Sequence, residues 1–288
     1  MAQRLDEGWY QLLSRSPNWF AFSPDSKRFA YASSISTVRV RDLEINQDVL
    51  LLDDFPTNIA RVFFSADGQK LYAVDSAPNW HVWDATPLPA EVLYEPLARR
   101  TFQNLRTTVG VKSEMMAIVN SDPKLHAVAR KRVLSLVEEH TEDWSKLNDM
   151  SWGTVVKPQA TAAAYELALK QAQRADELNP NSMYALNTLG IALYRAGRFN
   201  EAVGALKRAV ELHLKSDGNP YEGNLAFLAM SHHRLGNRAE AERYLKELRT
   251  VMNRPEAVLT AEEHNFLAEA EQTVANNTVG SERSSDAK

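Results

Sequence analysis

The sequence contains no cysteine. This absence excludes disulfide bonds, thiolate catalysis and every zinc site built from cysteine ligands. Long apolar runs are also missing: no stretch of about 18 apolar residues occurs, and the first residues lack the apolar core of a secretory signal. We therefore predict a soluble chain without a membrane-spanning helix, and we expect it in the cytoplasm.

The sequence also lacks a large excess of either positive or negative charge. Lysine and arginine total 33, aspartate and glutamate total 37, and the net charge is −4. Such a balance argues against a dedicated binder of nucleic acid or of an anionic membrane surface. We expect no nucleic acid among the partners of this protein.

Recognisable catalytic motifs are absent as well. The sequence has no phosphate-binding glycine loop, no dinucleotide fingerprint and no nucleophile elbow. His232 and His233 are adjacent, and neighbouring helical residues point about 100° apart, so this pair does not form a chelate. We predict no metal, no cofactor, no catalytic residue and no enzymatic activity; a convergent site without a motif is the alternative.

Two similar segments are present in the first ninety residues. "FSPDSKRFAYAS" begins at Phe22 and "FSADGQKLYAVDS" begins at Phe64, a period of about 42 residues. Each copy has a turn sequence, at 24–25 or at 67–68, between alternating apolar and polar residues. The pattern predicts seven strands, at 18–23, 27–33, 36–42, 48–52, 59–65, 69–75 and 79–84.

The period, the four short strands and the Trp83-Asp84 ending resemble the WD-repeat β-propeller. The resemblance implies about two blades of a partial propeller within residues 1–90. An unrelated small antiparallel sheet is the alternative. Because a propeller closes with about four to eight blades, we predict that residues 1–90 expose pairing edges and self-associate when expressed alone.

A different repeat follows after residue 145. Gly190 and Ala202 are small enough to let two antiparallel helices approach closely, and Gly197 suits a left-handed cap between them. The spacing is that of a tetratricopeptide repeat, a two-helix unit of about 34 residues. The central copy uses Leu186, Leu189, Gly190, Leu193, Ala202, Leu206 and Ala209, and the next copy uses Leu225, Leu228, Ala229, Gly236, Ala241, Leu245 and Leu248.

An eroded copy precedes these two. Counting back about 34 residues places Trp152 in its first helix, which Pro158 should break. At the other end, Thr260 and Glu263 form a capping box. The box predicts a last helix at 261–275, which covers the apolar face of the final repeat.

Four segments follow from these patterns. We expect propeller blades at 1–90, a helical connector at 91–150, repeats with a capping helix at 151–275 and a disordered tail at 276–288. Within the connector, Asp122-Pro123 is predicted to mark a helix start. The fold class is therefore mixed, β then α: a partial WD-type β-propeller followed by an α-helical tetratricopeptide superhelix.

The order of these segments resembles the carboxy-terminal region of large bacterial proteins, of the planctomycete type, that join WD repeats to tetratricopeptide repeats. The most specific pieces are residues 147–152, 187–190 and 225–236. Many such proteins carry a serine/threonine kinase domain, but no kinase signature is present in this sequence. The resemblance implies a protein or peptide partner, with a serine/threonine kinase among the candidates.

We predict a non-catalytic protein-interaction scaffold, because stacked repeats of this kind line a groove with their first helices. The alternatives are a regulatory segment of a bacterial serine/threonine kinase system and an unrecognised enzyme. Core packing of Ile191, Phe227 and Met230 is the competing interpretation for part of the groove. The expected groove residues are Tyr184, Asn187, Thr188, Ile191, Tyr194, Arg195, Phe227, Met230, His233 and Arg234.

Overall fold

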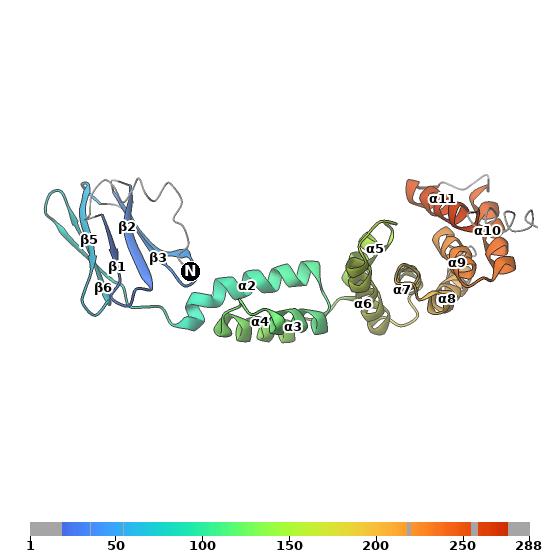
Figure 1. Ribbon diagram of the computed structural model, residues 1–288, viewed down its shortest axis with the longest axis horizontal. Helices are drawn as coiled ribbons and strands as arrows, with labels where there is room; N and C mark the ends of the chain where they lie inside the picture. Colours follow the sequence, from blue (N-terminus) through green and yellow to red (C-terminus); the bar gives the residue numbers. More distant parts are fainter. Residues whose placement is uncertain (1–18, 35, 54, 218–219, 255–258, 276–288) are drawn as a thin grey trace, which may run out of the picture. The chain divides into compact units, whose positions relative to one another are not determined.

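The computed structural model describes residues 19–34, 36–53, 55–217, 220–254 and 259–275. Within this part of the chain the strands come first and the helices follow (Figure 1). The chain separates into two compact units, residues 1–96 and 97–288. The tail predicted at 276–288 lies outside the described residues.

The first unit contains two antiparallel sheets, and the same turn occurs in both. The Lys27 amide donates to Asp25 Oδ1 at 3.1 Å, and the Gln69 amide donates to Asp67 Oδ1 at 3.0 Å. The sequence repeat is therefore a repeat of turn geometry. The first sheet has the order β1 (Phe20–Phe22), β2 (Arg28–Ser34), β3 (Thr37–Asp42), β4 (Gln47–Leu52), and the second has the order β5 (Ile59–Phe64), β6 (Lys70–Asp75), β7 (Trp80–Asp84).

Small and β-branched side chains form the core between these sheets. Val38 and Val62, one from each sheet, belong to the same buried cluster. The buried Arg28 side chain donates to the carbonyls of Gly68, at 2.9 Å, and Ala85. In the described part of the chain the strands form neither a closed barrel nor a complete propeller. The coarser prediction, β-sheets followed by repeated helix pairs, is confirmed.

Three helices follow the sheets: α2 (Ala90–Thr108), α3 (Lys112–Ser121) and α4 (Ala127–Glu139). Beyond Leu97 they belong to the second unit and share a core that contains Phe102, Met115 and Val133.

The helix start predicted at Asp122-Pro123 is wrong. Asp122 instead follows the end of α3 in an extended conformation, and its carboxylate accepts a hydrogen bond from the Lys124 amide at 2.8 Å. A proline disfavours the helical conformation of the residue before it, so Pro123 ends one helix rather than starting the next. The cap of α4 is His126, whose ring accepts from the Val128 amide.

Three helix pairs and one final helix complete the second unit. Gly197 and Gly236 occupy equivalent corners and have the same positive φ of 77°, which a side chain would strain. These corners let the second helices of the last two pairs return along the first helices. The pairs are α5 (Trp144–Val155) with α6 (Ala162–Leu178), α7 (Met183–Arg195) with α8 (Phe199–Asp217) and α9 (Glu222–Arg234) with α10 (Arg238–Met252), and the final helix is α11 (Ala261–Ala275).

The first pair corrects the register expected for the eroded copy. A constant spacing places its first helix around Trp152, with Pro158 inside it, whereas α5 begins at Trp144 and ends at Val155. Proline is costly in a helix interior, so the helix ends before Pro158 and a longer loop leads to α6. Trp152 thus lies in the last turn of α5.

Candidate peptide-binding groove

The first helices of the three pairs, α5, α7 and α9, pack beside one another (Figure 1). Together they present one surface, here called the first-helix face. The expected groove residues lie on two of these helices, because residues 184–195 belong to α7 and residues 227–234 belong to α9.

Burial divides the expected groove residues into two classes. Tyr184 and Arg234 are exposed and His233 is half-buried, so these three are available to a ligand. Six others have little or no exposed surface because neighbouring helices cover them. Asn187 and Thr188 are buried but border a cavity described below, and the other four belong to the hydrophobic core: Ile191, Tyr194, Phe227 and Met230.

Helix α11 lies across the first-helix face, with Phe266 as its buried anchor. The Phe266 ring contacts Phe227 of α9 at 5.4 Å between centroids and Trp152 of α5 at 6.2 Å, both nearly perpendicular. Gly223 leaves room for two rings, since a Cβ atom there would lie 2.6 Å from the Tyr221 ring and 3.3 Å from the Phe266 ring. One side chain of α11 therefore joins two first helices.

The one expected groove residue that remains is Arg195, and its guanidinium already forms an ion pair within the protein. Its side chain is only 6% exposed and forms a bidentate ion pair with Glu269 of α11, with Nη2 to Oε2 at 2.8 Å. Its Nε donates to the Val155 carbonyl at 2.9 Å, and its guanidinium lies 5.0 Å from the Phe227 ring centroid. A buried guanidinium of this kind needs a carboxylate partner, and α11 supplies it.

Glu262 attaches the first turn of α11 to the same face. Its carboxylate accepts from the Tyr221 hydroxyl at 3.4 Å. Burial raises the pKa of Glu262 above its ordinary value, and the neighbouring Tyr221 and Trp152 side chains partly offset that effect. Burial likewise raises the pKa of Tyr221.

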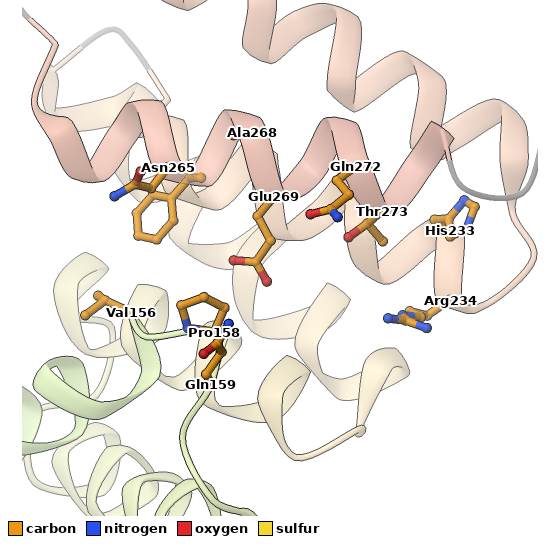
Figure 2. Close-up of a pocket in the computed structure, with 11 residues that line it drawn as sticks. Val156, Pro158, Gln159, His233, Arg234, Asn265, Ala268, Glu269, Gln272 and Thr273 are labelled. Carbon is orange, nitrogen blue, oxygen red and sulfur yellow. The ribbon is translucent and has the colours of Figure 1, made fainter.

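Beside α11 the first-helix face stays open at a cavity of about 890 Å³, here called the open cavity. Figure 2 shows Glu269 on α11 directed toward Pro158 and Gln159 of the α5–α6 loop, and His233 and Arg234 at the end of α9. The full lining is Val156, Pro158, Gln159, His233, Arg234, Asn265, Phe266, Ala268, Glu269, Gln272 and Thr273.

The lining of the open cavity is suited to a peptide. The amides of Gln159, Asn265 and Gln272 can donate to and accept from a peptide backbone. Arg234 is exposed and, among the described residues, forms no ion pair, so it can receive a carboxylate. Burial, followed by the charge of Arg234, lowers the pKa of His233, which favours a neutral ring that can also accept a hydrogen bond.

A second cavity of about 320 Å³ has Trp152 in its lining. Its floor is polar: the Asn187 amide donates to Asn224 Oδ1 at 2.6 Å, and both residues are buried. Asn148 Oδ1, also in this wall, is buried without a hydrogen-bond partner among the described residues. The lining is Asn148, Asp149, Trp152, Tyr184, Asn187, Thr188, His213 and Tyr221.

The described residues contain no cluster of histidine, aspartate and glutamate that could hold a metal ion. None of the described helices is long and apolar enough to cross a bilayer.

Reasoning from the sequence missed the side chains of α11. Glu262, Phe266 and Glu269 are spaced four and three residues apart, which places them on one face of a helix. The sequence displays this spacing, but the partners of these side chains lie as far as 74 residues away in the chain. The missing information is the place where α11 packs.

No curated protein matches the chain. Among solved structures, MamA AMB-1 is 18% identical, with a TM-score of 0.34 over 59% of this chain and 94% of that chain. A Podosopora anserina protein with nearly identical TPR-like repeats, described as a kinesin light chain, is 19% identical, with a TM-score of 0.33 over 66% of this chain and 90% of that chain. Such low scores carry no conclusion about function.

The match to a family is confined to the central helix pair. It covers α7 and all but the last residue of α8, the segment in which the sequence spacing is most regular. Residues 182–216 match the family model described as a tetratricopeptide repeat.

Proposed function

We propose that the helical repeats are a non-catalytic interaction module that binds a segment of another protein on the first-helix face. Repeats of this family stack into binding surfaces, and the central copy matches the family model. The observation that carries the proposal is the open cavity, which combines peptide-binding amides with the unpaired charge of Arg234. The partner segment is therefore acidic.

A charge reversal tests this proposal. Binding peptides are selected from a displayed library with the full chain and measured by fluorescence anisotropy. Arg234→Glu should weaken the selected peptides about tenfold, the effect of about 1.4 kcal/mol, because it removes a cation from the cavity. Arg238→Glu is the control, since Arg238 lies outside the cavity and is exposed, paired with Glu242. Equal effects of the two variants would refute the proposed site.

We also propose that the two sheets of the first unit are WD-type blades. The matched turns at Asp25 and Asp67, the strand order and the Trp83-Asp84 ending support this assignment. The link to a serine/threonine kinase stays a prediction from the sequence resemblance. A direct binding assay between this chain and a purified kinase that is encoded beside it tests that prediction.

A further inference from the structure

Helix α11 lies where a ligand of the repeats would lie. It packs chiefly on α9, a first helix, and less on α10, the helix that precedes it in the chain. Its side chains also meet α5 through Trp152 and α7 through Arg195. A helix that merely continued the stack would pack on the preceding second helix, as α9 packs on α8. The position of α11 is that of an occupant of the first-helix face.

One face of α11 makes these contacts in a defined order. Glu262 meets the Tyr221 hydroxyl and the Trp152 indole, Phe266 enters the aromatic site beside Phe227, and Glu269 pairs with Arg195. The acidic, aromatic and acidic residues follow at positions i, i+4 and i+7 of a helix. The receiving surface therefore selects an amphipathic helix with one aromatic anchor between two carboxylates.

Because of Arg195, any helix that occupies the first-helix face must carry an acidic side chain. The guanidinium is held among Tyr165, Tyr194 and Phe227, which supply ring faces but no counter-charge. Its other hydrogen bond goes to the neutral carbonyl of Val155. A buried cation whose carboxylate is removed is strongly destabilising, so a helix that takes the place of α11 must bring a carboxylate to this point.

We propose that α11 is a replaceable occupant, and that the partner of this protein displaces it with an amphipathic helix of the same acidic–aromatic–acidic pattern. The proposal rests on the interaction function proposed above and specifies its partner: the incoming helix takes over the wall of the open cavity that α11 forms, opposite Arg234. The segment 253–260 tethers α11 to α10. Because α11 belongs to the same chain, its binding is intramolecular, so α11 excludes weak helices and yields only to a helix with better contacts.

The test uses the full chain and a fluorescein-labelled synthetic peptide of residues 260–275 as the incoming helix. In a Glu269→Lys chain, α11 meets Arg195 with a like charge while the first-helix face is unaltered. We expect this chain to bind the peptide at least about tenfold more tightly than the wild-type chain does. The control is Glu271→Lys, a change of equal charge on α11 at the exposed pair with Arg249 of α10, which should change affinity less than about twofold.

Exchanging the charges of Arg195 and Glu269 provides an independent test. The Arg195→Glu chain should bind a peptide that carries Glu269→Arg at least about tenfold more tightly than the unmodified peptide, provided that circular dichroism shows native helix content. Equal affinity of both peptides, or equal binding by the wild-type and Glu269→Lys chains, would overturn the proposal. Dimerisation of the wild-type chain by exchange of α11 would overturn it too, because the occupant would then be a second copy. A positive Arg234→Glu result would leave the interaction function standing in each case.

Discussion

At Gly190 an added Cβ atom would lie 2.5 Å from Leu206 Cγ and 3.3 Å from the Leu206 backbone nitrogen. Gly204, on α8, has no atom within 4 Å of the same position apart from its chain neighbours and the backbone of its own helix. We expect Gly190→Ala to lower the free energy of unfolding by about 1–3 kcal/mol through overpacking. Gly204→Ala should raise it by up to about 1 kcal/mol, because alanine favours a helix over glycine.

Urea titrations followed by circular dichroism at 222 nm measure both changes at Gly190 and Gly204. If the two variants unfolded at the same urea concentration, α7 and α8 would not approach as closely as described.

His232 makes the stability of the last repeat dependent on pH. The ring is buried, stacks on Tyr244 at 5.5 Å, and its Nε2 has no hydrogen-bond partner among the described residues. Burial lowers its pKa, as do the charges of Lys207 and Arg243, against the opposing effect of Glu240. The folded state therefore binds a proton less readily than the unfolded state, whose histidine has a pKa near about 6.5.

The neutral His232 ring makes its full contribution to the free energy of unfolding above about pH 6.5. This contribution is lost as the pH falls through the lower pKa that His232 has in the folded state. Between about pH 7 and pH 5, the thermal midpoint of the wild-type protein should fall more steeply than that of a His232→Phe variant. The variant keeps His140 and His233, whose pKa values burial also lowers, so the difference between the two curves isolates His232. Parallel curves would contradict this expectation.

At the scale of single elements, much of the architecture was predictable from local pattern. The seven strands lie within two residues of their expected ranges, and α11 runs from 261 to 275 as its capping box predicts. The Thr260 amide donates to Glu263 Oε2 at 2.7 Å, and the Glu263 amide donates to Thr260 Oγ1 at 3.2 Å. Alternation, caps and turn residues act over a few positions, so a sequence displays them directly.

The candidate site was less predictable, because it depends on contacts between distant elements. The sequence identified Arg195 as a groove residue but not its partner Glu269. The burial of Ile191 and Met230 likewise follows from how α7 and α9 pack with their neighbours. The first helix of the eroded copy was misplaced because counting at a constant period cannot show where a loop has lengthened.

The capping box gives a prediction for α11 itself. Thr260→Ala removes the side-chain acceptor of the Glu263 amide, and the loss of such a cap typically costs about 1 kcal/mol. Hydrogen exchange of residues 261–275, followed by mass spectrometry, should become several-fold faster. Thr250→Ala on α10 is the control, since its hydroxyl bonds within its own helix to the Lys246 carbonyl. Faster exchange of α11 in the control would exclude a specific role for the cap.

At the scale of the whole molecule, the division into two units predicts that they behave differently when separated. Trp80 is 65% exposed and Phe22 is 57% exposed. The edge strands β4 and β7 each have one neighbour in the described sheets. Exposed aromatic rings beside unpaired strand edges favour association. Residues 1–90 alone should therefore self-associate, whereas residues 91–276 should be a helical monomer.

Size-exclusion chromatography with limited proteolysis separates these outcomes. A Trp80→Ser change in the 1–90 fragment should reduce its association, because it removes the most exposed large ring among the described residues of this fragment. A compact, monomeric and protease-resistant 1–90 fragment would show that two sheets suffice and that no further blades are required.

The attachment of α11 also has a mechanical consequence. Its contacts are distributed along the helix, from Glu262 near the start to Glu271, which pairs with Arg249, near the end. Tension applied beyond residue 275 loads the Glu271 pair first, then the Glu269–Arg195 pair, and then the Phe266 anchor, one turn after another. Sequential loading peels a helix at low force, so a pull on this end would uncover the first-helix face without any competing ligand.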